Sequence, residues 1–153
     1  MPDTGVLPVR RKRPLLPTTE QLEKQLPDAD IVIGCLPGTK QTAGMFTNKM
    51  ISLMKPSALF CNVGRGNLVE DENFLISALK EGKIGGAVLD VTAQEPIPAD
   101  HPIWECPNTI LSQHSGGGNL TEYEGIANFF MDNLKAFKEN KPLKNQILLG
   151  KGY

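Results

Sequence analysis

The sequence has few of the features that mark membrane or secreted proteins. None of its apolar runs reaches the roughly 18 residues that a membrane-spanning helix needs, and its first residues contain no apolar core of a signal peptide. It has three cysteines, Cys35, Cys61 and Cys106, without a C-x-x-C pair, so neither a disulfide framework nor a zinc site is indicated. We therefore predict a cytoplasmic protein with buried, reduced thiols, no membrane partner and no metal ion.

An excess of charge of one sign is also lacking. The 153 residues contain 16 Lys and Arg against 17 Asp and Glu, a formal net charge of −1, which gives no electrostatic reason to expect a nucleic-acid partner. With 40% hydrophobic and 22% charged residues, the chain has the composition of a globular domain. Residues 1–17 differ from the rest, because they combine the basic run 10–13 with four prolines. We predict an irregular arm or remnant strand there, either a solvated tail or a phosphate-binding corner.

Apolar runs of strand length recur along the rest of the chain. They cover residues 30–36, 58–63, 85–91 and 108–111. Helical patterns alternate with them: a short helix after the capping pair Thr18 and Gln21, one or two turns over 48–54, a helix after the acidic residues 70–72, and a last helix after the capping pair Thr121 and Glu124. This alternation predicts an α/β fold with a parallel sheet whose strands are covered on both faces.

Polar residues and glycines follow each predicted strand. Arg65 follows the second strand, Asp90 closes the third with Glu95 five residues later, and His114 follows the fourth. Because ligands of open α/β sheets bind beyond the carboxyl ends of the strands, these side chains can converge on one crevice. There an arginine can bind a carboxylate through two hydrogen bonds, and a histidine oriented by a carboxylate can transfer a proton. Each also has an interpretation as an ordinary loop residue, and we interpret His101 as structural.

Five stretches of the sequence occur in one known family in the same order and spacing. They are Leu-Pro-Gly-Thr-Lys-Gln-Thr (36–42), Met-Lys-Pro-Ser-Ala-Leu-Phe-Cys-Asn-Val-Gly-Arg-Gly (54–66), Ala-Leu-Lys-Glu-Gly-Lys-Ile-Gly-Gly-Ala-Val-Leu-Asp-Val (78–91), Gln-Glu-Pro (94–96) and Pro-Asn-Thr-Ile-Leu-Ser-Gln-His-Ser-Gly-Gly (107–117). On these stretches the chain resembles the D-isomer-specific 2-hydroxyacid dehydrogenases, which include glyoxylate/hydroxypyruvate reductases and phosphoglycerate dehydrogenases. The resemblance implies a partial Rossmann-type parallel sheet flanked by helices.

The resemblance also divides the chain into three parts and assigns roles to residues. Residues 1–17 are the basic arm or remnant strand, 18–118 a partial NAD(P)-binding domain, and 119–153 a C-terminal helix and tail that in the family returns to the substrate domain. The implied catalytic residues are Arg65, which binds the substrate's carboxylate and carbonyl, Glu95, which hydrogen-bonds the catalytic histidine, and His114, the general acid and base. The implied cofactor-binding residues are Arg10, Arg11, Leu36, Pro37, Val63, Gly64, Arg65, Asp90 (at the nicotinamide carboxamide), His114, Gly116 and Gly117.

Four positions bear on cofactor choice and pocket shape. Arg10 and Arg11 match the place where the family selects the adenosine ribose; arginines there favour the 2′-phosphate, so NADP is slightly favoured over NAD. Thr92 stands where the family usually has an aromatic residue, and Gln113 where it usually has a proline. The resemblance therefore does not determine the shape of the substrate pocket.

The implied reaction is the interconversion of a 2-oxo acid and a D-2-hydroxy acid by hydride transfer. However, the 153 residues contain no G-x-G-x-x-G turn for the pyrophosphate, and the N-terminal part of the family's substrate domain is lacking. We therefore expect a truncated part of the enzyme that is inactive alone; the alternative is a catalytically inactive dinucleotide-binding or assembly module. The last helix has an apolar face, which predicts a homo-oligomer. Its residues are Ile126, Phe130, Leu134 and Phe137.

Overall fold

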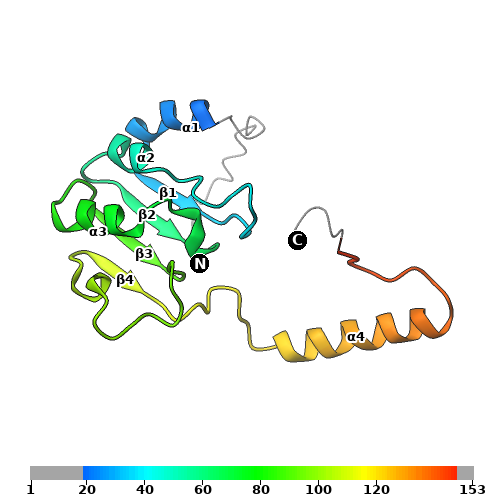
Figure 1. Cartoon of the computed structure of the whole chain (residues 1–153). Coiled ribbons are helices and arrows are strands. Elements are labelled where there is room, and N and C mark those ends of the chain that lie inside the picture. The colour runs from blue at the N-terminus through cyan, green and yellow to red at the C-terminus, as the bar shows by residue number, and fades with distance from the viewer. Residues whose placement is uncertain (1–18, 148–153) are drawn as a thin grey trace, which may run out of the picture.

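Four parallel strands form the centre of the computed structural model, which describes residues 19–147 (Figure 1). They are β1 (Ile31–Gly34), β2 (Leu59–Asn62), β3 (Gly86–Leu89) and β4 (Thr109–Leu111), and they lie side by side in that order. The last residues of the four strands, Gly34, Asn62, Leu89 and Leu111, are partners in the register. All four chain segments therefore leave the sheet at one level of the same edge.

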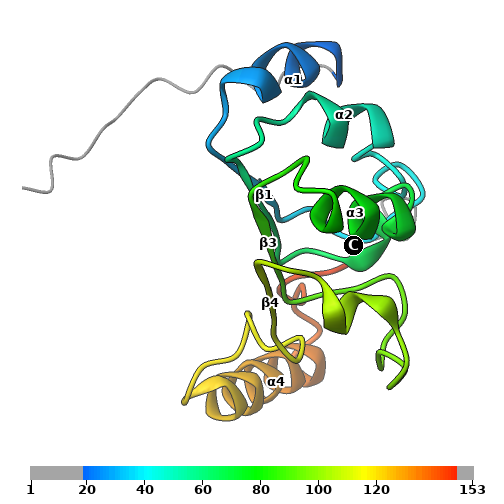
Figure 2. The same ribbon diagram turned by 90° about the vertical axis from the view of Figure 1, so that its left-hand side faces the viewer.

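The helices that precede and connect the strands all lie on one side of the sheet (Figure 2). They are α1 (Thr19–Gln25), α2 (Asn48–Leu53) and α3 (Glu72–Lys80), with short 3₁₀ turns η1 (Leu26–Asp28), η2 (Gly66–Leu68) and η3 (Pro102–Glu105). Because the strand order follows the chain order without reversal, right-handed connections place every crossover on the same face. The predicted α/β fold with a parallel sheet flanked by helices is confirmed.

The other face of the sheet is open among residues 19–147. Ile31 and Ile33 of β1 are 57% and 62% exposed, and Ile110 of β4 is 64% exposed. The prediction that the strands are covered on both faces is therefore wrong for the part of the chain that the structure describes. The sheet never reverses its strand order, so its crossovers leave this second face without a helix.

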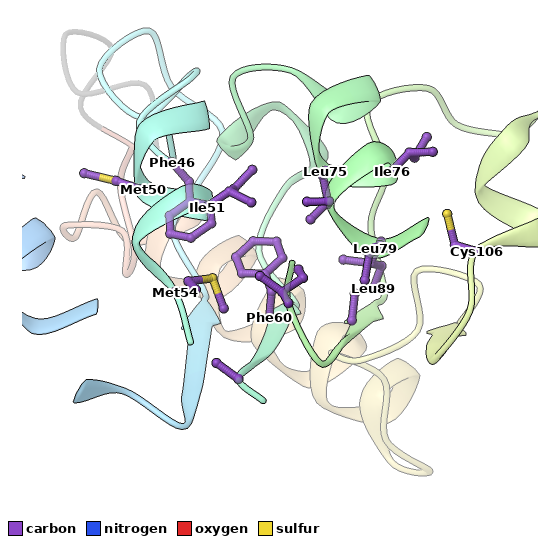
Figure 3. Packing of buried hydrophobic residues seen from close by; sticks show 14 of the residues in the cluster. Phe46, Met50, Ile51, Met54, Phe60, Leu75, Ile76, Leu79, Leu89 and Cys106 are labelled. Atoms are coloured by element: carbon purple, nitrogen blue, oxygen red, sulfur yellow. The ribbon is translucent and has the colours of Figure 1, made fainter. Parts of the chain in front are cut away.

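The core lies between the covered face of the sheet and helices α2 and α3 (Figure 3). Phe46 and Phe60 stack at its centre, with ring centroids 4.6 Å apart and an interplanar angle of 4°. Met50, Leu75 and Leu79 of the helices belong to the same buried cluster. Burying each of these large side chains contributes roughly 1.5–3 kcal/mol to the free energy of folding, which stabilises the packing of the helices on the sheet.

Side chains cap two of the helices, whereas a predicted capping pair does not form. Thr47 caps α2 by accepting a hydrogen bond from the backbone N–H of Met50, and Asp71 caps α3 through the N–H of Asn73. The predicted capping pair of Thr121 and Glu124 is wrong, because the Thr121 hydroxyl bonds instead to Oδ1 of Asn119, 2.9 Å away. The other predicted pair, Thr18 with Gln21, begins outside the described residues.

The long helix α4 (Glu122–Lys138) extends away from the sheet (Figure 1) and buries none of its residues. On its predicted apolar face, Ile126, Phe130 and Phe137 are exposed and Leu134 is half-buried. Among the described residues, no helix is both long and apolar enough to cross a membrane.

The cysteines only partly follow their prediction. All three are free thiols; Cys106 is buried, Cys61 is half-buried and Cys35 is exposed. Burial raises the pKa of the Cys106 thiol. The prediction of burial is wrong for Cys35, because this residue directly follows β1, an edge strand of the described sheet.

Candidate active site

The turn that carries Arg65 is held by the last residue of β2. The Asn62 side chain is buried; its Oδ1 accepts a hydrogen bond from the N–H of Gly64 at 3.1 Å, and its Nδ2 donates to the carbonyl of Arg65 at 3.0 Å. The guanidinium of Arg65 folds over the same turn and donates from Nη1 to the Gly64 carbonyl at 2.7 Å. A side chain of the sheet thus fixes the backbone from which Arg65 projects.

Gly66 brings this turn against the loop that follows β3. A Cβ atom at this position would lie 1.8 Å from the carbonyl oxygen of Thr92, so only glycine permits the approach. As a result, Arg65 and Glu95 line the same small pocket, together with Gly38, Gly66, Asn67, Thr92 and Ala93.

Glu95 and His114 form a direct pair across the ends of β3 and β4. Nδ1 of His114 lies 2.7 Å from Oε2 of Glu95, while Oε1 of Glu95 accepts a hydrogen bond from the N–H of Thr92 at 3.0 Å. The two side chains are 43% and 37% exposed, so solvent and ligands can reach them. The hydrogen bond from His114, and then that from Thr92, holds the pKa of the Glu95 carboxyl below its usual value. Glu95 is therefore an anion at neutral pH.

This pairing fixes which nitrogen of His114 is available. A histidine that donates from Nδ1 to a carboxylate presents Nε2 as its second position for a proton. Its backbone has φ of +54°, a left-handed conformation that costs a non-glycine residue about 1–3 kcal/mol. Neighbouring contacts must hold the residue in this conformation.

Asp90 provides these contacts. Its Oδ1 accepts hydrogen bonds from the Ser112 hydroxyl and from the N–H of Ser115 at 2.9 Å, and its Oδ2 accepts one from the N–H of Gly116 at 2.8 Å. The Ser112 bond, then those from Gly116 and Ser115, lowers the pKa of the Asp90 carboxyl. The aspartate after β3 therefore binds the chain on both sides of His114.

An open cavity of about 740 Å³ adjoins this group of residues. Its lining combines the polar side chains of Asp90, Glu95 and His114 with the apolar side chains of Ile97, Trp104 and Leu111. The full lining comprises Asp90, Thr92, Glu95, Pro96, Ile97, Trp104, Leu111, Ser112, Gln113, His114 and Ser115. Among the described residues, no group of three or more His, Cys, Asp or Glu side chains is arranged to hold a metal ion.

The residues predicted for the site differ in how closely the structure groups them. Arg65, Glu95, His114 and Asp90 meet at the carboxyl edge of the sheet, as their positions after the strands indicated. Leu36 and Pro37 follow β1 in a loop closed by Thr42, whose hydroxyl donates to the Pro37 carbonyl. Arg10 and Arg11 lie outside the described residues.

Sequence reasoning missed two supports of the site, Asn62 and Ser112. Asn62 carries a signal that could have identified it, because it is an amide at the end of an otherwise apolar strand. Ser112 has no comparable signal, since a serine after a strand is common in loops.

The described residues suit the nicotinamide end of a dinucleotide. The Asp90 carboxylate uses three of about four acceptor positions, so Oδ2 has room for one hydrogen bond from a carboxamide N–H. Val63, half exposed after β2, offers an apolar contact at the same edge.

The sheet and the polar residues on its carboxyl edge define a dinucleotide-binding domain of the Rossmann type. A family model described as D-isomer specific 2-hydroxyacid dehydrogenase, NAD binding domain, matches residues 6–116. The chain therefore belongs to the D-isomer-specific 2-hydroxyacid dehydrogenase family, and both the resemblance and the cofactor class predicted from sequence are confirmed.

Curated relatives and solved structures agree with this assignment. The chain is 40% identical to glyoxylate/hydroxypyruvate reductase B of Shigella boydii over 126 residues, 82% of this chain and 39% of the relative. It is 39% identical to glyoxylate reductase of Pyrococcus furiosus over 120 residues, 78% of this chain and 35% of the relative. The chain thus spans well under half the length of these relatives.

Among solved structures, a D-isomer specific 2-hydroxyacid dehydrogenase from Xanthobacter autotrophicus Py2, in complex with NADPH and MES, superposes with a TM-score of 0.76 at 32% identity, covering 88% of this chain and 54% of that one. The NADPH-dependent glyoxylate/hydroxypyruvate reductase of Sinorhizobium meliloti, in complex with NADP and malonate, has a TM-score of 0.68 at 33% identity, covering 76% and 36%.

Proposed function

We propose that this chain carries the proton-transfer part of an NAD(P)-dependent reductase that interconverts a 2-oxo acid and a D-2-hydroxy acid. The observation that carries the proposal is the 2.7 Å contact between His114 and Glu95, with Arg65 across the adjoining pocket. An arginine, a carboxylate and a histidine in this arrangement combine anion binding with general acid–base chemistry.

In this function the three residues have different tasks. Arg65 binds the carboxylate of the oxo acid and polarises its carbonyl. The Glu95 anion orients the ring of His114 through Nδ1. His114 then passes the proton on Nε2 to the oxygen of the substrate carbonyl as that oxygen gains negative charge. In the oxidative direction the same atom takes the proton from the hydroxyl.

The nicotinamide cofactor, when bound, supplies a hydride to the keto carbon of the 2-oxo acid or accepts one from the same carbon of the 2-hydroxy acid. Asp90 would hold its carboxamide through the free position on Oδ2, and Val63 with Gly64 would contact its ring end. We favour NADP over NAD, because two solved relatives contain NADPH or NADP and because Arg10 and Arg11 suit a 2′-phosphate.

We further propose that residues 18–118 act as a partial cofactor domain, that 119–153 are the C-terminal helix and tail that in the family returns to the substrate domain, and that the 153 residues alone have little or no turnover. Two observations support this proposal. The 153 residues contain no G-x-G-x-x-G turn, and they cover only 39% and 35% of the two relatives named above. The free thiols suit a reducing compartment, so we assign the protein to the cytoplasm. The exposed apolar residues of α4 support a homo-oligomer.

The proposal is tested by incubating the isolated chain with NADPH or NADH and glyoxylate, hydroxypyruvate or pyruvate, while following nicotinamide absorbance. We expect little or no reduction but measurable, weak NADPH binding that Asp90→Ala reduces. Robust turnover would refute the claim that these residues are only part of the enzyme. The contribution of His114 to catalysis is tested in the chimera described in the Discussion. If the chain binds NADPH but His114 contributes nothing to catalysis there, an inactive dinucleotide-binding module is favoured instead.

A further inference from the structure

We propose that Glu72 is a positioning residue for this site, and that His101 orients its carboxylate. This inference rests on the proposed function for its purpose, because the loop that Glu72 holds contains Glu95. Glu72 lies in the first turn of α3, on the helical side of the sheet. Its Oε1 accepts a hydrogen bond from the N–H of Ala93 at 2.9 Å, and its Oε2 lies 3.5 Å from Nε2 of His101.

The pair of Glu72 and His101 is largely enclosed and has a defined proton arrangement. The two side chains are only 14% and 19% exposed. Nδ1 of His101 accepts a hydrogen bond from the N–H of Ile103 at 3.4 Å, so this nitrogen carries no proton. The ring proton is therefore on Nε2, the atom that faces Glu72. His101 thus presents a donor to one oxygen of the carboxylate while Ala93 uses the other.

The position of Ala93 links this pair to the active site. The successive backbone N–H groups of Thr92 and Ala93 bind two different carboxylates, Glu95 and Glu72. On its other side, Thr92 packs against Gly66, next to Arg65. The loop is therefore held between α3 and the turn that carries Arg65. Glu72 restricts the peptide groups that set the distance between Arg65 and Glu95.

A simpler role for Glu72 would be favourable charge at the N-terminus of α3. Two substitutions separate the two roles. Glu72→Gln removes the charge but keeps an oxygen at the same reach, whereas Glu72→Asp keeps the charge but withdraws the oxygens by one methylene group. If Glu72 positions the loop, Gln keeps an oxygen for Ala93 and loses only the contact with His101, because its amide N–H₂ group then faces the Nε2–H donor, whereas Asp loses the contact with Ala93. If only charge matters, the order is reversed.

The experiment uses NMR on the whole 153-residue chain and compares Glu72→Ala, Glu72→Asp and Glu72→Gln. Glu81→Ala, which removes an exposed carboxylate paired with Lys83 at the other end of α3, is the matched control. The first readout is amide hydrogen exchange at Thr92 and Ala93. We expect exchange about fivefold faster or more in the Ala and Asp variants, a smaller increase in Gln, which keeps only the Ala93 contact, and near-native exchange in the control.

The second readout is the pKa of the Glu95 carboxyl, followed through its side-chain carbon signal. Losing the Ala93 contact loosens the Thr92 bond to Glu95, so the pKa of Glu95 should rise in Glu72→Ala and Glu72→Asp. Removing a nearby negative charge alone would lower it, so Glu72→Gln should show no rise. Neither readout requires cofactor or turnover, and a failed reductase assay therefore leaves this test intact.

The role of His101 is tested with His101→Asn. Asparagine can still cap η3, whose first turn His101 now caps through Ile103, but it does not extend a donor to the distance of Glu72. We expect faster exchange at Ala93 than in the wild type. Native exchange in both Glu72→Asp and His101→Asn, or equal effects of Glu72→Gln and Glu72→Ala, would overturn the proposal.

Discussion

Nδ1 of His114 lies 2.7 Å from Oε2 of Glu95, although the two residues are 19 positions apart in the chain. The contact joins the loops after β3 and β4, and further hydrogen bonds fix both loops. The N–H of Thr92 fixes the other oxygen of Glu95, and Asp90 binds the chain on both sides of His114's turn. These contacts hold the pair in a defined geometry, as preorganised proton transfer requires.

The first prediction concerns the close approach of Gly66 to Thr92. Gly66→Ala places a methyl group 1.8 Å from a backbone oxygen, so we expect the free energy of unfolding to fall by about 2 kcal/mol or more. Chemical denaturation followed by the fluorescence of Trp104, the single tryptophan, measures it. Gly125→Ala, whose added methyl meets nothing within 4 Å, is the control and should not lower stability. Equal stability of the two variants would contradict the described packing.

The second prediction concerns Asn62, the buried side chain that holds the Arg65 turn. Asn62→Leu conserves size but removes the partner of the Gly64 N–H and one of the two donors to the Arg65 carbonyl, which keeps the N–H of Leu68 at 3.1 Å. We expect a loss of roughly 2 kcal/mol of stability. NMR should also show chemical-shift changes concentrated at residues 63–66. Changes spread evenly over the sheet would instead indicate general repacking.

The third prediction is a loss of stability in acid that comes from Asp90 and Glu95. Both carboxyls have pKa values lowered by folding from ordinary values of 3.8 and 4.5. A lowered pKa means that the folded state favours the anion. The stabilisation is therefore complete above the ordinary pKa and is lost as the pH falls through the lowered one.

Denaturation curves at decreasing pH measure this effect. Asp90→Asn and Glu95→Gln should each be less stable than the wild type at neutral pH, and the difference should shrink in acid as the wild-type carboxyls become protonated. A difference that stays constant down to the most acidic point would show that ionisation of these groups does not contribute.

The fourth prediction concerns association through the apolar face of α4. Because Ile126, Phe130 and Phe137 are exposed, we expect a dimer or larger assembly at micromolar concentration. Phe130→Glu should shift sedimentation towards the monomer. Lys138→Glu, which adds negative charge to the same helix without changing its apolar face, should not. A strictly monomeric wild-type chain would contradict this prediction.

The sequence indicates the strands and the edge on which the site lies because both depend on local patterns. Apolar runs define β1 to β4, and the residues that follow them, among them Arg65 and His114, must share an edge in a parallel sheet. The proposed contact of Glu95 with His114 is also present, since it joins two such ends.

Other features depend on long-range placement that no local pattern encodes. The open face of the sheet follows from the strand order. An apolar strand residue such as Ile33 gives the same sequence pattern on a covered face of the sheet as on an exposed one. The bond of Thr121 to Asn119 competes with the capping pair, and the sequence does not decide between them. The contact of Glu72 with Ala93 joins residues 21 positions apart, and an acidic residue at a helix start already has a sufficient local explanation.

The central claim, that Arg65, Glu95 and His114 form a working proton-transfer site, is tested most directly in a chimera. Residues 31–118 of this chain replace the matching segment of a glyoxylate/hydroxypyruvate reductase, which supplies the missing parts of the cofactor and substrate sites. The kcat/KM for glyoxylate reduction with NADPH is then compared between the chimera and its His114→Ala variant, with Glu81→Gln as the control. NADPH binding and thermal unfolding establish that each protein is folded.

We predict that the chimera reduces glyoxylate, that His114→Ala lowers kcat/KM by at least about 100-fold while NADPH still binds, and that Glu81→Gln leaves it unchanged. A folded, NADPH-binding chimera whose turnover is no higher than that of its His114→Ala variant would contradict the account.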